Sequence, residues 1–256
     1  MLQEAIDILS DWGSLDTSIV ITAALAGMAC ALPGNFLVLR KQSMMGDALS
    51  HTVLPGIVFA FLLAYWLDRS GYISETTRAA TLPAALFGGA IVIGILSAVL
   101  TEWVHRLGRV ESSAALGVVF ITLFAFGLLL IRLKADSVHI DPDCVLFGSV
   151  ETPKSRQTWM VGILLCVNLL LVTIFYKELK VSAFDPGLAT SLGIHAKTMH
   201  YALMAVTAAT LVAAFESVGS ILVIAMLIAP PATAYLLTDR LSHMIILSLL
   251  IAALLL

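Results

Sequence analysis

The chain has 256 residues, of which 60% are hydrophobic and only 12% are charged. A soluble domain has about 45–50% apolar and roughly 25% charged residues, so this chain has too little charge to cover a water-exposed surface. The composition excludes a soluble enzyme and a disordered chain, and a net charge of −3 leaves no basic face for nucleic acid. It indicates an integral membrane protein whose residues 1–256 form one transmembrane domain.

Apolar runs long enough to cross a bilayer follow one another along the chain. A hydrocarbon core about 30 Å thick needs roughly 20 helical residues. We therefore predict an all-α fold of about eight transmembrane helices, at 17–39, 47–67, 80–100, 114–131, 158–176, 200–215, 219–237 and 244–256. The last run is short because the chain stops inside it, and we interpret it as a truncated final helix.

The nearly continuous apolar stretch 200–237 is too long for one span, since a single helix would exceed about 50 Å. The run Glu216-Ser217-Val218-Gly219 interrupts it and predicts two helices joined at that point. With the N-terminus outside, eight basic residues lie in inner loops and six in outer loops, a weak bias. The inner ones are Arg40, Lys41, Arg106, Arg109, Lys177, Lys180, Lys197 and Arg240.

Helix breakers occur inside three spans, at Pro33-Gly34, Pro55-Gly56 and Pro230-Pro231. A proline inside a helix removes one backbone hydrogen bond, and in a membrane the freed carbonyl needs a protein or water partner. Transporters use such breaks to line a translocation site. A plain packing kink is the alternative, because proline and glycine are common in spanning helices.

The second span carries a carboxylate and an imidazole four residues apart, Asp47 and His51, which therefore share one helix face. Ser50 lies beside the same face. An intramembrane carboxylate is costly, and a carboxylate with an imidazole is half of a site for Mn²⁺, Fe²⁺ or Zn²⁺. The alternative is a pair that satisfies itself and caps the helix. Glu216 is a possible third ligand or gate, or simply an acid at a helix start.

A short inner helix is predicted after the fifth span. Asp185 suits an N-cap, Pro186 the first helical position and Gly193 the stop, which gives about two turns. Such an element can dock a partner protein or lie on the surface with no partner. The chain contains no G-x-x-x-x-G-K-[ST] loop for ATP and no H-E-x-x-H or G-x-S-x-G motif.

Three segments resemble the permease subunits of bacterial ABC importers for manganese, zinc and iron. They are LRKQSMMGDALSHTVLPG at 39–56, FDPGLATSLGI at 184–194 and ESVGSILVIAMLIAPPATA at 216–234, with a weaker match in LFGSV at 146–150. The resemblance implies the ABC importer permease fold in the bacterial plasma membrane. It also implies a second permease copy or paralogue, two cytosolic ATPase subunits and an extracytoplasmic metal-binding protein as partners, and no enzymatic activity in this chain.

The resemblance also implies roles for individual residues. Asp47 and His51 match residues of the metal pathway, with Ser50 and Glu216 as further candidates. The segment that docks the ATPase corresponds to Phe184, Asp185, Pro186, Gly187, Leu188, Ala189 and Gly193. The metal is cargo rather than a bound cofactor, and 39–56 is more similar to manganese-type members. Two alternatives remain from the residues alone, an ion-gradient-driven carrier using Asp47 and Glu216, and an intramembrane metalloenzyme.

Overall fold

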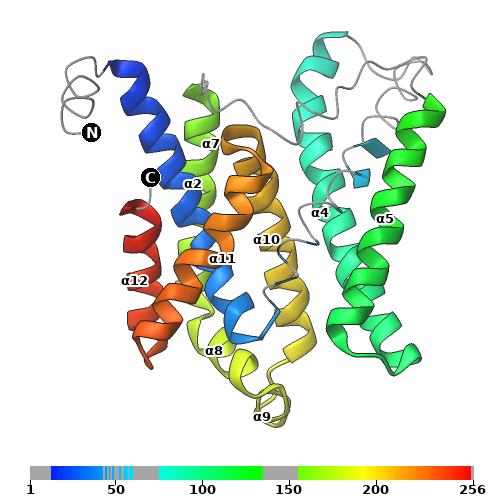
Figure 1. The fold of residues 1–256 in the computed structure, drawn as a ribbon, viewed down its shortest axis with the longest axis vertical. Coiled ribbons are helices and arrows are strands. Elements are labelled where there is room, and N and C mark those ends of the chain that lie inside the picture. Colours follow the sequence, from blue (N-terminus) through cyan, green and yellow to red (C-terminus); the bar gives the residue numbers. More distant parts are fainter. Residues whose placement is uncertain are drawn as a thin grey trace, which may run out of the picture.

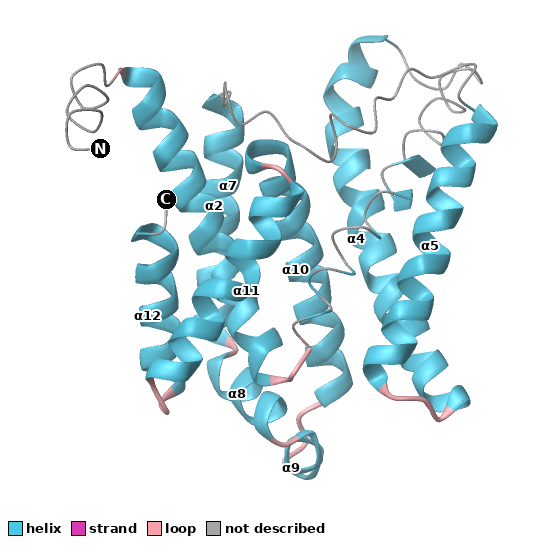
Figure 2. Cartoon of the chain, in the orientation of Figure 1, coloured by secondary structure: helices cyan, strands magenta, loops and turns pink. Residues whose placement is uncertain are grey.

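The computed structural model describes residues 13–42, 75–134 and 155–254, together with residues 44, 46, 48, 52, 55, 56, 58 and 59. The described residues form helices and no strand (Figures 1 and 2). The helices are α2 (Ser14–Leu39), α4 (Glu75–Gly108), α5 (Ser112–Lys134), α7 (Ser155–Ile174), α8 (Tyr176–Phe184), α9 (Pro186–Ser191), α10 (Ala196–Val218), α11 (Ser220–Leu237) and α12 (Leu241–Leu254).

The predicted all-α membrane fold is confirmed. Each predicted span except the second coincides with one of these helices, and the second lies largely outside the described residues. Five of the described helices are long and apolar enough to cross a membrane, and α11 and α12 are shorter apolar helices. The structure thus confirms the class of the fold, while the total of eight spans stays a prediction.

One difference from the predicted elements concerns the loop after the fifth span. Residues 177–184, expected to be loop, form most of helix α8. The chain turns only at Phe175, where the amide of Phe175 still donates to the carbonyl of Leu171 and the amide of Leu179 to that of Phe175. Helical hydrogen bonding therefore runs on past the membrane span, and α8 leads directly into the short helix α9.

Helix α2 lies at the centre of the larger group of helices, where it packs against α7, α10, α11 and α12. The α4–α5 hairpin packs against this group through α10 (Figure 1). Large side chains of the shared core are fully buried, among them Phe36, Leu32, Met204, Leu227 and Met244. The segment between α2 and α4 must therefore pass from the larger group to the hairpin.

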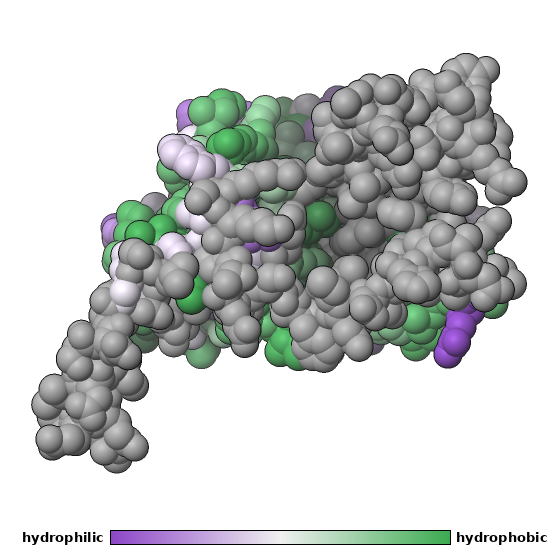
Figure 3. Space-filling model, turned by 90° about the horizontal axis from the view of Figure 1, so that it is seen from above, coloured by the Kyte–Doolittle hydropathy of each residue, from purple (hydrophilic) through white to green (hydrophobic). Residues whose placement is uncertain are grey.

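Apolar side chains also cover the outside of the molecule. Figure 3, seen from the end opposite α9, shows green apolar residues at the outer surface. Helices α5 and α7 expose Ile121, Leu129, Trp159 and Ile163, each with more than half of its surface free. Exposed apolar area on this scale is unfavourable in water and suits contact with lipid chains.

The predicted division of the 200–237 stretch is confirmed. Gly219 separates α10 from α11 with φ +86° and ψ 157°, a conformation that is essentially restricted to glycine. Its amide donates to the carbonyl of Phe215 at 3.1 Å, and its carbonyl accepts from Val223 at 3.2 Å. One residue therefore ends the first helix and begins the second.

Pro33 lies inside α2, and the helix continues through it. Because proline has no N–H, the carbonyl of Ala29 four residues earlier loses its helical donor. The side-chain amide of Asn168 on α7 donates to this carbonyl at 3.0 Å and to the hydroxyl of Thr210 on α10 at 2.8 Å. Asn168 is buried, so one amide compensates the proline and joins three helices.

Replacing Asn168 with Leu should lower the stability of the folded protein. The substitution keeps the size of the side chain but leaves the Ala29 carbonyl without a donor, at a cost of about 1–2 kcal/mol. The measurement is the thermal unfolding midpoint in detergent. Thr173→Val, which removes a local hydrogen bond on the exposed face of α7, is the control and should change the midpoint much less. Equal midpoints for both variants would contradict this role of Asn168.

Candidate functional site

The helix breakers of the first and seventh predicted spans meet in space. Gly34 of α2 lies so close to α11 that a Cβ atom there would overlap the carbonyl oxygen of Leu227 and lie 3.0 Å from Cγ of Pro231. That carbonyl is the one that Pro231 deprives of its helical donor. The two helices therefore approach closely beside a proline of each, and a residue with a Cβ atom at position 34 would not permit the approach.

The start of the second span packs against the same point. A Cβ atom on Gly46 would overlap Cδ2 of Leu227, so the Leu227 residue lies between Gly34 and Gly46. We call this contact, formed by Gly34, Gly46, Leu227 and Pro231, the proline junction. It places the residue that precedes Asp47 against α11, at the point where α11 contacts α2.

Further along the second span, the described residues contact the α4–α5 hairpin. A Cβ atom on Gly56 would lie 2.7 Å from the carbonyl oxygen of Gly89 and 2.8 Å from Cγ2 of Ile93, both on α4. Pro55 approaches Gly127 of α5 in the same way. Gly46 therefore lies at the proline junction, and Pro55 and Gly56 lie at the hairpin, and all three of these residues are buried.

None of the four predicted metal ligands has a side chain that the structure describes. Asp47, Ser50 and His51 lie outside the described residues. Glu216 belongs to α10, three residues before the Gly219 turn, but its side chain is also outside the description. Of the segment that carries Asp47 and His51, the described residues Gly46, Ala48 and Thr52 are buried. The ligand roles of these four residues stay predictions.

The predicted short inner helix is present as α9. The Asp185 carboxylate accepts hydrogen bonds from the amides of Gly187 and Leu188, each at 2.9 Å, and Pro186 opens the helix. At the other end Gly193 has φ +81°. The amide of Ile194 donates to Ala189 and that of Gly193 to Thr190, which is a Schellman motif. Both predicted caps are therefore confirmed.

The α8–α9 corner exposes three large apolar side chains. Phe184, Leu188 and Leu192 are 62%, 51% and 61% exposed. Ala189, next to Leu188, is fully buried and anchors the helix. Because α9 protrudes at the end of the bundle (Figure 2), these side chains lie at that end of the molecule, and exposed apolar side chains there are typical of a site that binds another protein or a membrane surface.

The basic residues expected in inner loops belong to the same end of the molecule as α9. Arg40, Lys41, Arg106 and Lys197 line one cavity together with Pro186 of α9. Lys177 and Lys180 lie on α8, Arg109 in the α4–α5 turn and Arg240 in the α11–α12 turn, at that end of the bundle (Figure 1). This grouping supports placing α9 on the cytosolic side.

That cavity, of about 540 Å³, contains a junction that the sequence did not reveal. Nη2 of Arg40 donates to Oγ of Ser182 on α8 at 2.9 Å, and Nη1 lies 3.1 Å from Nδ1 of His200 on α10. Burial lowers the pKa of Arg40 below its ordinary value. From the sequence, Arg40 was informative only for orientation, and His200 had no predicted role, because their contact joins residues 160 positions apart.

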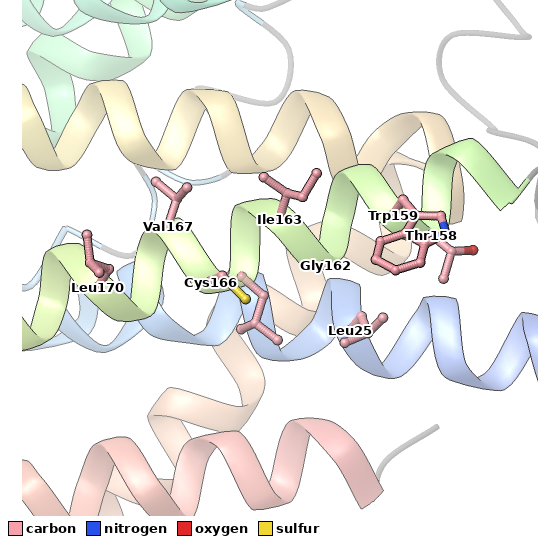
Figure 4. A pocket seen from close by; sticks show the side chains of 9 residues that line it. Leu25, Thr158, Trp159, Gly162, Ile163, Cys166, Val167 and Leu170 are labelled. Atoms are coloured by element: carbon pink, nitrogen blue, oxygen red, sulfur yellow. The ribbon is translucent and has the colours of Figure 1, made fainter.

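A second cavity has a different character (Figure 4). It has a volume of about 620 Å³ and lies between α2 and the exposed face of α7. It is lined by Leu25, Thr158, Trp159, Gly162, Ile163, Leu165, Cys166, Val167 and Leu170. The hydroxyl of Thr158, its one polar side chain besides the Trp159 indole, is hydrogen-bonded to Thr22, so this cavity suits an apolar occupant rather than a cation.

A model of the family described as "ABC 3 transport family" matches residues 15–256. The chain belongs to this family. It is 42% identical to the manganese transport system membrane protein MntD of Bacillus subtilis, over 94% of this chain and 81% of that protein. It is 43% identical to the zinc transport system membrane protein TroD of Treponema pallidum, over 83% of this chain and 57% of that protein.

A solved structure, PsaBC from Streptococcus pneumoniae in complex with Fab, matches 99% of this chain and 83% of the matched chain, with a TM-score of 0.76 and 34% identity. The resemblance inferred from the three sequence segments is thereby confirmed. The chain is a multi-pass permease subunit of the bacterial plasma membrane rather than an enzyme. The alternatives of a gradient-driven carrier and of an intramembrane metalloenzyme are set aside.

The close approach at the proline junction predicts that Gly34→Ala destabilises the protein by about 1–3 kcal/mol, because the added methyl group would force α2 and α11 apart. Thermal unfolding in detergent measures the loss. Gly162→Ala on α7 is the matched control, since a Cβ atom there meets nothing within 4 Å. That control should be neutral or stabilising by about 0.5–1 kcal/mol, as is usual for glycine in a helix. A neutral Gly34→Ala would refute the contact.

Proposed function

We propose that this chain is the permease of an ATP-driven importer of divalent transition metal ions, with Mn²⁺ as the preferred cargo. It works with a second permease copy or paralogue, cytosolic ATPase subunits and an extracytoplasmic metal-binding protein. The observation that carries the proposal is the position of Gly46. The residue directly before Asp47 packs on Leu227, where two proline-containing helices meet inside the fold.

Asp47 and His51 act in this proposal as ligands of the passing ion. Both follow Gly46 within one and a half helical turns, and their spacing of four residues puts them on one helix face. A carboxylate and a neutral imidazole suit a divalent transition metal. Ser50 and Glu216 are further candidates for the same pathway, since Glu216 lies just before the Gly219 turn that leads into α11.

Helix α9 acts in this proposal as the coupling helix that docks in the ATPase. Its two caps fix its ends within six residues, and Ala189 anchors one side. The exposed side chains of Phe184, Leu188 and Leu192 are available to a partner. Exposure of three apolar side chains to water costs free energy, and burial of these side chains against a second protein would remove that cost.

Manganese is preferred on the resemblance of residues 39–56 to manganese-type permeases. Overall identity does not separate the metals, since the relatives named for manganese and for zinc are 42% and 43% identical to this chain. Carboxylate and imidazole ligands also serve Mn²⁺, Fe²⁺ and Zn²⁺ alike. The preference is therefore tested directly, by uptake of each metal in turn.

The ligand proposal predicts that Asp47→Asn and His51→Gln each abolish metal uptake at normal membrane levels. An amide of similar size neither carries the carboxylate charge nor offers the imidazole nitrogen, whereas it would preserve a purely structural pair. The assay is uptake of Mn²⁺, Zn²⁺ and Fe²⁺ by cells that lack their own importers, with Mn²⁺ expected to be fastest. Asp239→Asn, in the α11–α12 turn, is the control. Full uptake in both well-expressed variants would end the ligand assignment.

The coupling proposal predicts that Leu188→Glu uncouples the importer. A buried glutamate in an apolar interface is unfavourable, so ATPase binding or metal transport per ATP should fall, while the caps of α9 remain intact. Co-purification of the ATPase and transport in proteoliposomes are the readouts. Val110→Glu makes the same change at an exposed position of the α4–α5 turn and should have little effect. Normal assembly and transport by Leu188→Glu would remove α9 from the coupling role.

A further inference from the structure

We propose that Arg40 is the positioning residue that transmits movement of the coupling helix to the metal-binding segment. The proposal rests on the function proposed above, and it concerns how the two parts of that function are linked. Its basis is the junction of Arg40, Ser182 and His200 in the cytosolic-side cavity.

Arg40 links elements from three parts of the chain. Its guanidinium donates to Ser182 on α8, three residues before the Asp185 cap of α9. It also reaches His200 in the first turns of α10, which begins just after α9. The guanidinium is therefore held by the helices on both sides of α9, and a displacement of α9 would act on Arg40 through α8 and α10.

In the chain, Arg40 lies in the turn that leads from α2 into the second span. The end of α2 is a Schellman motif, in which the amide of Gln42 donates to Leu37 at 2.9 Å and that of Lys41 to Val38 at 3.0 Å. Lys41 takes the left-handed conformation, with φ +56°, without being a glycine. The turn fixes the direction in which the chain leaves Arg40, and Gly46 reaches the proline junction six residues later.

The chemistry of the junction requires arginine. An arginine has no acceptor, so Nδ1 of His200 must accept and the imidazole is neutral with its proton on Nε2. Within the described residues, no carboxylate lies in ion-pair contact with Arg40, and its buried Nε has no partner. The planar fork holds two neutral acceptors on different helices at once, which a lysine ammonium does not reproduce.

The cavity leaves room for this junction to move. It has a volume of about 540 Å³, and it is lined by the end of α2, by Glu102 and Arg106 of α4, and by residues of α8, α9 and α10. Glu102 is paired with Arg106 one turn along α4. The guanidinium of Arg40 therefore borders open space rather than packed core side chains alone.

The test is Arg40→Lys in the complete importer, reconstituted in proteoliposomes with its ATPase and supplied with Mn²⁺. The number of metal ions transported per ATP hydrolysed should fall at least about five-fold, the lower end of typical coupling between sites. Assembly with the ATPase and thermal stability should stay near those of the unmodified protein. Arg240→Lys, at an exposed position of the α11–α12 turn, is the matched control and should keep the normal ratio.

Two further variants keep the proposal testable if Arg40→Lys does not fold. Ser182→Ala and His200→Phe each remove one acceptor, and each should lower the ratio in part. Combining Ser182→Ala with Arg40→Lys should add little to the effect of Arg40→Lys alone, since both act through one contact. A normal ratio in these variants, or parallel losses of transport and ATP hydrolysis, would overturn the proposal.

The outcomes separate this inference from the proposed function. If the unmodified importer moves no metal, or if Asp47→Asn and Leu188→Glu have no effect, the proposed function itself is wrong. If those two variants fail as expected while Arg40→Lys transports with the normal ratio, only the role of Arg40 is refuted.

Discussion

The need to satisfy backbone carbonyls away from water shapes the interior of this protein. Each proline inside a membrane helix frees one carbonyl, which no solvent can reach in the hydrocarbon core. At Pro33 the freed carbonyl of Ala29 receives the amide of Asn168 from another helix. At Pro231 the carbonyl of Leu227 instead faces the bare Cα of Gly34. The breaks thus bring α2, α7, α10 and α11 together, and the rest of the bundle is arranged around them.

Backbone carbonyls are satisfied differently in the interior of the bundle and at the end that carries α9. Inside the bundle, carbonyls are met by side chains and by close helix contacts. At the cytosolic end, helices α2 and α9 both end in Schellman motifs, at Lys41 and Gly193, which satisfy their last carbonyls within the chain. These ends need no external partner to be ordered. The side chains of α9 remain free for a partner protein, and the path of the chain after α2 is fixed by its own turn.

Local chemistry made much of the fold predictable from the sequence. Hydropathy located the spans, because length and apolarity are properties of each segment alone. The caps of α9 at Asp185 and Gly193 and the division at Gly219 also follow from the preferences of single residues. Helix α8 was missed because its sequence is polar enough to suggest a loop, although its hydrogen bonding continues from α7 almost without a break.

What the sequence could not predict depends on contacts between distant residues. Neither the pairing of Asn168 with the carbonyl of Ala29 nor that of Arg40 with His200 leaves a periodic signal, because each joins residues more than 130 positions apart. The breakers were visible as residues, but their meeting at Leu227 was not. The four-residue spacing of Asp47 and His51 was also visible in the sequence. Their ligand roles are still predictions from that spacing and from the family resemblance.

The energetic cost of charge in a membrane explains why the site and the breaks belong together. A carboxylate at the centre of a spanning helix costs at least about 2.5–3.5 kcal/mol on insertion scales. The outer faces of α5 and α7 are apolar and give such a group no partner. The proline junction lies in the interior, where backbone carbonyls have already lost their helical donors. Gly46 packs at this junction, and the proposed ligands Asp47 and His51 follow it directly in the chain. The hydrogen bonds of Arg40 join the end of α2 to α8 and α10, the helices on either side of α9.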